Sequence, residues 1–232
     1  KHVDIILVGD SMANVLYGHK NTHRITLENI IQHTLSVKMG VKKSLLVVDM
    51  PKGSYNSFRN ANKNAKLIMK TTKCDAIKIE SNKKNYKIIE GLVKKNIPVM
   101  GHVGYTPQFK KKFKIEGQTK LEISKLLKEA EFIQKAGAFC IVLECLSPSA
   151  AKLITSRLSI PTIGIGSSAH CDGQILVTDD MLGLSGFYPK FVKKYAKLDR
   201  IIEIAIKRYA RAVKLKKFPT LNNYLNGPKH RK

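Results

Sequence analysis

The sequence repeats one kind of segment, a short run of mostly branched apolar residues that ends on a polar and mostly ionisable side chain. Runs of this composition are typical of strands buried on both faces, as in parallel sheets. Polar endings at the same point of successive strands therefore predict one functional site along the carboxyl edge of the sheet. The five side chains that end these runs are Asp10, Asp49, Glu80, His102 and Glu144.

Helical patterns separate the apolar runs. The predicted strands lie at 4–9, 45–49, 76–80, 98–103, 138–144, 162–166 and 174–178. The predicted helices lie at 26–39, 57–70, 84–95, 119–134 and 148–158, and a mostly helical segment follows from Pro189 to Lys216. Strands that alternate with helices at this spacing indicate βαβ units and a parallel sheet.

The distribution of polar endings favours a closed barrel over an open sheet. A (β/α)₈ TIM barrel carries its site around the C-terminal rim, whereas a doubly wound sheet gathers its site at one switch point. A closed barrel needs eight strands and seven are predicted, so the first β-α unit is expected to precede Lys1. We expect one barrel domain over residues 1–232, with a frayed basic tail over 222–232.

Charge is the most unusual feature of the composition. The 232 residues include 42 Lys or Arg and 17 Asp or Glu, a net charge of +25. A polyanion binder is one interpretation of this excess. However, the basic residues are spread through every predicted helix, and aromatic residues do not interleave with them as a base-stacking platform requires. We therefore expect solvated basic faces and no specific nucleic-acid partner.

Other sequence features exclude further classes of protein. No apolar run approaches the ~20 residues of a membrane span, so no membrane association is expected. The cysteines do not form a CxxC pair, which disfavours a zinc site. Unpaired cysteines of this kind predict a reducing, cytoplasmic compartment. The four cysteines are Cys74, Cys140, Cys145 and Cys171.

Two carboxylates, Asp10 and Asp49, end neighbouring predicted strands. Such a pair suits a hard divalent ion such as Mg²⁺, which keeps open positions for water and substrate. Each residue could instead cap the turn or helix that follows it. Taken together, the two carboxylates favour a metal site.

The later strand ends each allow more than one interpretation. Lys78 and Glu80 point to the same side of one strand, where Lys78 could form an internal ion pair or contact a substrate anion. His102 could orient a substrate, transfer protons or be a hydrogen-bonded core histidine. Glu144 could be a general base or a structural partner of Lys78. The Gly/Ser-rich stretch 164–174 could form a phosphate cradle or only a tight turn.

Longer motifs resemble one known family. Over nearly the whole chain and in the same order, the sequence resembles the ketopantoate hydroxymethyltransferase family. Two departures are a more basic loop at 19–24 and two serines in the turn at 166–169. The segments that carry the resemblance include Val8-Gly9-Asp10-Ser11, Val48-Asp49-Met50-Pro51-Lys52-Gly53-Ser54-Tyr55, Pro98-Val99-Met100-Gly101-His102-Val103-Gly104-Tyr105-Thr106-Pro107-Gln108 and His170-Cys171-Asp172-Gly173-Gln174.

The resemblance implies a fold and a reaction. It implies a TIM barrel of the phosphoenolpyruvate/pyruvate-binding type that assembles as a homo-oligomer, a homodecamer. It implies transfer of a hydroxymethyl group from 5,10-methylenetetrahydrofolate to 3-methyl-2-oxobutanoate (2-oxoisovalerate) through a Mg²⁺-stabilised enolate. The product is ketopantoate, and the reaction is the first step of pantothenate biosynthesis.

The resemblance also implies a role for each candidate site residue. Asp10 and Asp49 match ligands of Mg²⁺ that also border the substrate, and Glu80 matches an acid that holds metal-bound water. Ser11 and Lys78 match substrate contacts. His102 matches a further residue of the substrate site, and Glu144 matches the base that removes the C3 proton.

Two other functions remain in view. A related barrel enzyme could run a lyase or retro-aldol step on a 2-oxo acid with the same Mg²⁺ site, and folate dependence would separate the two enzymes. A non-enzymatic polyanion-binding protein would show salt-sensitive RNA binding and no Mg²⁺-dependent chemistry. The complete set of rim residues argues against the second alternative.

Overall fold

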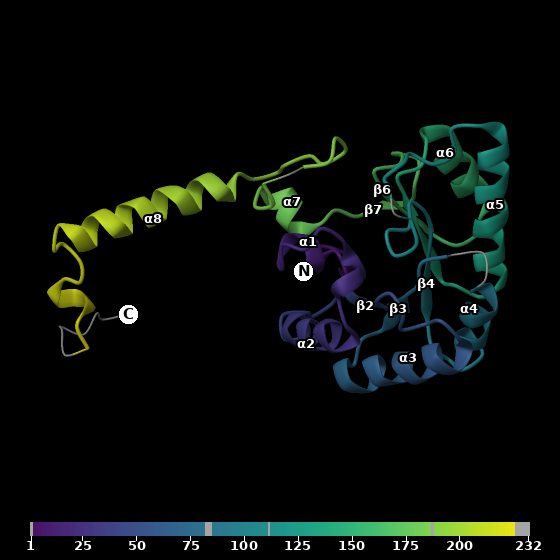
Figure 1. Cartoon of the computed structure of the whole chain (residues 1–232), viewed down its shortest axis with the longest axis horizontal. Helices are drawn as coiled ribbons and strands as arrows, with labels where there is room; N and C mark the ends of the chain where they lie inside the picture. The colour runs from purple at the N-terminus through teal and green to yellow at the C-terminus, as the bar shows by residue number, and fades with distance from the viewer. Residues whose placement is uncertain (1, 82–84, 111, 187, 226–232) are drawn as a thin grey trace. The chain divides into compact units, whose positions relative to one another are not determined.

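Parallel strands in chain order form the central sheet of the protein (Figure 1). The computed structural model describes residues 2–81, 85–110, 112–186 and 188–225. Within these residues each strand pairs in parallel with the next one along the chain. The seven strands are β1 (Ile5–Val8), β2 (Leu45–Asp49), β3 (Ala76–Lys78), β4 (Val99–Gly104), β5 (Cys140–Glu144), β6 (Thr162–Ile165) and β7 (Gly173–Gln174).

Helices alternate with the strands, as predicted. Ser or Thr residues cap the first turns of α2, α3, α5 and α6 by accepting a backbone N–H, which fixes where these helices begin. The helices are α1 (Met12–Val15), α2 (Leu27–Lys38), α3 (Phe58–Thr72), α4 (Tyr86–Val93), α5 (Lys120–Lys135), α6 (Pro148–Arg157), α7 (Thr178–Leu182) and α8 (Leu198–Lys214). Short 3₁₀ turns lie at Thr22–Arg24 and Leu221–Asn223.

The two faces of the sheet bury different side chains. One face packs against helices α2 to α6 and forms the large apolar core (Figure 1). The other, interior face holds a smaller apolar cluster built from alternate strand positions, including Val47, Ala76, Met100, Cys140 and Val142. Because strand side chains alternate between faces, the next interior positions toward the carboxyl ends are polar. The interior is thus apolar below a polar rim.

The structure corrects three boundaries. The strand predicted at 174–178 is wrong in extent, because β7 ends at Gln174 and helix α7 begins at Thr178. Acidic residues in the first turn of α7 favour a helix start there. The stretch after Asp10, where no helix was predicted, contains α1. The helix predicted from Pro189 begins at Leu198. The predicted helix start at Lys84 and tail residues 226–232 lie outside the described residues.

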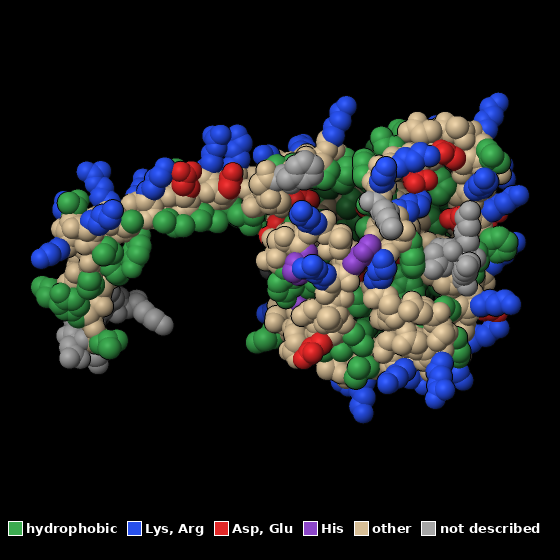
Figure 2. All heavy atoms as spheres, viewed as in Figure 1, with side chains coloured by type: hydrophobic (Ala, Val, Ile, Leu, Met, Phe, Trp, Pro, Cys, Tyr) green, Lys and Arg blue, Asp and Glu red, His purple; other side chains and the backbone are tan. Residues whose placement is uncertain are grey.

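The chain divides into two compact units, one up to Ile175 and one from Leu176 onward. Surface Lys and Arg side chains are scattered over the visible face of the first unit (Figure 2). In the second unit, α8 carries an apolar face on which Ile201, Ile202 and Tyr209 are exposed, opposite a charged face (Figure 2). Among the described residues, no helix has the length and apolar character needed to cross a membrane.

Gly104 ends β4 at a place where no side chain fits. Its φ is +102°, and a Cβ there would lie 2.2 Å from the backbone oxygen of Glu144 in the paired strand. The glycine therefore lets β4 and β5 stay paired to the rim while the chain turns into the following loop.

Gly104→Ala should lower the free energy of unfolding by about 2–4 kcal/mol, because backbone strain and a steric clash add. Gly53→Ala is the matched control, since Gly53 also has a positive φ (+86°) but no atom near the added methyl group. The control should lose only about 1–2 kcal/mol. If both variants lose the same free energy of unfolding in urea, the close approach to Glu144 adds nothing to the cost of the substitution.

Candidate active site

The carboxyl ends of the strands bring the predicted site residues together on the interior side of the sheet. Asp49 and Lys78 are register partners in β2 and β3. His102 pairs with Val142, and Glu144 pairs with Gly104. Since side chains alternate along a strand, these four residues occupy the next interior positions after the apolar cluster, toward the carboxyl ends of the strands. The shared edge predicted from the sequence is confirmed.

A buried chain of contacts joins Asp10, Asp49 and Lys78. The backbone N–H of Asp10 donates to Oδ2 of Asp49 at 3.0 Å. Lys78 donates from Nζ to Oδ1 of Asp49 at 2.6 Å, and all three residues are buried. Of the two interpretations of Lys78, the structure thus shows the internal ion pair, and its partner is Asp49 of the neighbouring strand.

Burial sets the protonation of this group. Burial, with the charge of Asp49 second, raises the pKa of Asp10 to about 7. For Lys78 burial alone would lower the pKa, but the nearby carboxylates, Asp49 foremost, outweigh it and raise that pKa above its ordinary value. The lysine therefore stays charged, while burial favours the protonated form of Asp10 over its carboxylate.

Glu80, His102 and Glu144 line the next part of the rim. His102 Nε2 lies 3.3 Å from Oε2 of Glu144, and Nδ1 lies 4.0 Å from Oε1 of Glu80. Neither ring nitrogen has hydrogen-bond geometry with another described atom. Burial, and then the charge of Lys78, lowers the pKa of His102, so the imidazole is neutral near pH 7. Burial raises the pKa of Glu80 well above its usual range.

Glu144 differs from the other acids in being partly open to solvent. Its side chain is 21% exposed, compared with 1% for Glu80. Ser11, the remaining predicted contact, lies at the start of α1. A Cβ placed at Gly9 would come within 3.1 Å of Oγ of Ser11 and 3.4 Å of Oδ2 of Asp49, so both groups flank Gly9. All seven predicted site residues thus lie along this edge of the sheet.

Two residues of the site had no role in the sequence-based prediction. Gln108 is buried in the loop after β4 and donates from Nε2 to Oδ2 of Asp10 at 2.9 Å. Its backbone N–H donates to Oε2 of Glu80 at 3.0 Å. Tyr55 donates from its hydroxyl to Oε1 of Gln108 at 2.6 Å. The motif that contains Gln108 was recognised, but no local pattern marked this residue as a partner of the acids.

The donor set fits Mg²⁺. Within the described residues, no three His, Cys, Asp or Glu side chains come together as a complete metal cage. Mg²⁺ does not need one, because it is usually held by one or two carboxylates and completes its coordination with water and substrate oxygens. Asp10 and Asp49 supply two such carboxylates on neighbouring strand ends, where the backbone N–H of Asp10 donates to Oδ2 of Asp49.

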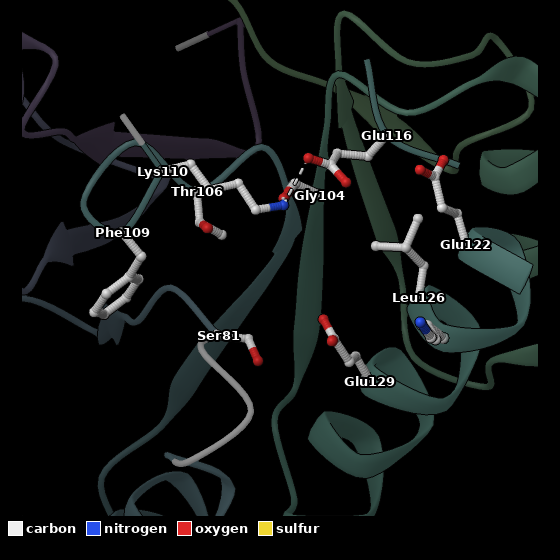
Figure 3. A pocket seen from close by; sticks show the side chains of 10 residues that line it. Ser81, Gly104, Thr106, Phe109, Lys110, Glu116, Glu122, Leu126 and Glu129 are labelled. Atoms are coloured by element: carbon white, nitrogen blue, oxygen red, sulfur yellow. Dashed lines mark hydrogen bonds and ion pairs between the residues drawn. The ribbon is translucent and has the colours of Figure 1, made fainter. Parts of the chain in front are cut away.

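A pocket of about 330 Å³ lies beside the loop that carries Gln108 (Figure 3). Thr106, Phe109 and Lys110 line it, while Gln108 faces the acids of the site. Lys110 forms an ion pair with Glu116 at 2.8 Å and also donates to the backbone oxygen of Gly104 at 2.7 Å. These contacts anchor the outer side of the loop.

The Gly/Ser-rich stretch 164–174 uses its polar groups within the fold. Ser167 accepts from the backbone N–H of Leu146 at 3.1 Å and donates to the backbone oxygen of Leu143 at 2.6 Å. Asp172 accepts from the backbone N–H of Thr162 at 2.8 Å. These bonds tie the stretch to β5 and β6, which supports the interpretation as a structural turn.

Comparison with known proteins identifies the family. The model for ketopantoate hydroxymethyltransferase matches residues 1–221. The 3-methyl-2-oxobutanoate hydroxymethyltransferase of Pelagibacter ubique (strain HTCC1062) is 48% identical over 95% of this chain and 86% of the relative. The chain belongs to the ketopantoate hydroxymethyltransferase family. The enzyme of the same name from Thermococcus kodakarensis is 43% identical over 96% of this chain and 79% of its own length.

Solved structures place the fold. A 2,3-dimethylmalate lyase, described as a PEP mutase/isocitrate lyase superfamily member, covers 97% of this chain and 80% of its own with a TM-score of 0.56 and 13% identity. A putative phosphonomutase from Burkholderia cenocepacia J2315 has a TM-score of 0.57 and 11% identity, with coverage of 93% and 85%. At these identities the likeness concerns the fold alone, and the predicted barrel class is confirmed.

Lys78→Met should lower the free energy of unfolding by about 3–5 kcal/mol, because it leaves the buried Asp49 carboxylate without its cation. Lys94→Met is the control, since the pair of Lys94 with Glu90 is exposed and its loss should leave the urea midpoint nearly unchanged. A Lys78→Met protein as stable as the control would contradict the dependence of Asp49 on Lys78.

Proposed function

We propose that this family member transfers a hydroxymethyl group from 5,10-methylenetetrahydrofolate to 3-methyl-2-oxobutanoate and forms ketopantoate. Family membership supports the reaction. The observation that carries the proposal is the arrangement of the rim, where the buried Asp10–Asp49–Lys78 group shares one edge of the sheet with the more exposed Glu144. This arrangement provides an anion-binding part and a proton-accepting part of one site.

The buried part of the rim suits a 2-oxo acid. Such a substrate carries a carboxylate beside a keto oxygen, and Lys78 offers a permanently charged ammonium to these oxygens. Ser11 offers a hydroxyl beside Gly9, which Asp49 also flanks. Asp10 and Asp49 are the proposed ligands of Mg²⁺, and Glu80 is the proposed acceptor for its water. The chemistry supplied by bound Mg²⁺ is Lewis-acid stabilisation of negative charge on the keto oxygen.

Glu144 is the proposed general base. Its carboxylate accepts the proton from C3 of the substrate, and the electron pair of the broken C–H bond moves onto the keto oxygen. Neutral His102 borders that carboxylate, with Nε2 3.3 Å from Oε2 of Glu144. The nucleophilic C3 then forms a carbon–carbon bond to the one-carbon unit as one of its two bonds to folate nitrogen breaks. Water forms the carbon–oxygen bond of the hydroxymethyl group as the second carbon–nitrogen bond breaks. The two nitrogens take up the proton removed from C3 and one proton of the water, which gives tetrahydrofolate.

Glu144→Gln should abolish deuterium incorporation at C3 of 3-methyl-2-oxobutanoate in D₂O with Mg²⁺, because the amide cannot accept the proton. Proton NMR without folate measures this half-reaction, and a thermal melt checks that the variant is folded. Glu28→Gln on the exposed start of α2 is the control and should exchange at the wild-type rate. Exchange that persists in the Glu144→Gln protein would refute the role of this residue.

The folate step is tested separately on the wild-type protein. Adding 5,10-methylenetetrahydrofolate should convert the exchanging substrate to ketopantoate, with tetrahydrofolate released in equal amount. Exchange without a folate-dependent product would contradict the transferase proposal and favour a lyase acting on a 2-oxo acid. Loss of exchange on addition of EDTA would support the proposed need for Mg²⁺.

A further inference from the structure

We propose that Gln108 is a positioning residue that fixes the orientation of the Asp10 and Glu80 carboxylates, and that Tyr55 locks Gln108 in place. The inference rests on the proposed metal site and extends it to two residues outside the set inferred from the family motifs. The juxtaposition that carries it is one buried glutamine in contact with two of the site's acids.

Every polar group of the Gln108 side chain is used. Nε2 donates to Oδ2 of Asp10 at 2.9 Å and to the backbone oxygen of Met50 at 3.0 Å. Oε1 accepts from the Tyr55 hydroxyl at 2.6 Å. A flipped amide would place its oxygen against two acceptors and its nitrogen against the Tyr55 hydroxyl, which then could only accept, so the contacts select one orientation. The side chain is therefore held rigidly.

The main chain of Gln108 extends the same function to Glu80. Its N–H donates to Oε2 of Glu80 at 3.0 Å, which leaves Oε1 turned toward His102. Because Nε2 likewise donates to Oδ2 of Asp10, Gln108 fixes one oxygen of each acid and thereby sets the direction of the other. Hydrogen bonds that orient a metal-binding carboxylate in this way raise the affinity for the ion.

Tyr55 connects this arrangement to a second loop. Its side chain is buried, and its ring packs edge-on against Phe109 with the ring centroids 6.2 Å apart. Met50 and Tyr55 both belong to the segment that follows β2. Through its hydrogen bonds, Gln108 therefore connects the segments that follow the carboxyl ends of β1, β2, β3 and β4. A leucine at position 108 would fill similar space but supply no side-chain donor. A glutamate would add a further carboxylate beside Asp10.

The decisive experiment measures metal affinity without turnover. Mn²⁺ replaces Mg²⁺ as a probe, and electron paramagnetic resonance counts free ion in titrations of wild type, Gln108→Leu and Tyr55→Phe. Gln108→Leu should weaken Mn²⁺ binding by about 10- to 100-fold, and Tyr55→Phe should weaken it less. C3 exchange at saturating Mg²⁺ should then recover part of the lost rate in Gln108→Leu.

Gln134→Leu is the matched control. Gln134 also accepts hydrogen bonds, from the backbone N–H groups of Ser159 and Ile160. It lies at the C-terminal end of α5, away from the site. It should lose stability without losing Mn²⁺ affinity. If Gln108→Leu fails to fold, Tyr55→Phe alone carries the test, because it removes one hydroxyl and keeps the ring.

The outcomes separate this inference from the proposed metal site. Wild-type protein that binds no Mn²⁺ would overturn both. Wild-type protein that binds Mn²⁺ while both variants bind it equally well would overturn only the role of Gln108 and Tyr55. A parallel loss in Gln134→Leu would show that the effect comes from general destabilisation, which also contradicts the inference.

Discussion

The ion pair between Asp49 and Lys78 is the contact on which the rest of the site depends. Asp49 uses one oxygen for Lys78 and the other for the backbone N–H of Asp10, so it joins the exits of β1, β2 and β3. A buried charge without a partner is strongly unfavourable, so neither side chain can leave this arrangement alone. The pair brings charged groups into the interior of the sheet while keeping them compensated.

The two faces of the sheet divide stability from chemistry. The face toward the helices packs mainly apolar side chains and can supply most of the free energy of folding. The interior face changes from apolar to polar within one or two strand positions, as from Val142 to Glu144. Period-two alternation makes this possible, because a strand can end in the site without disturbing the helices behind it. The free-energy cost of burying the polar site is therefore confined to the strand ends and leaves the apolar core unchanged.

The sequence-based prediction was correct for the features that a local residue pattern controls. Apolar runs with polar endings located Asp10, Asp49 and Glu144, because strand periodicity dictates which residues reach the rim. The same reasoning could not find Gln108, which lies in an irregular loop and acts through contacts with distant segments. The same reasoning wrongly placed Ile175–Val177 in a strand. An apolar run of that length does not distinguish a strand from the segment that precedes a helix.

The order of the strands has a consequence for how the molecule assembles. Each strand pairs with the next along the chain, so the sheet can grow through contacts between near neighbours in sequence. The bond from Gln108 to Asp10 instead spans 98 residues. Closing so long a loop is entropically unfavourable until the intervening strands are in place. On this kinetic argument the contact between Gln108 and Asp10 forms only after β1 to β4 have paired, so this part of the candidate site depends on the strands that carry it.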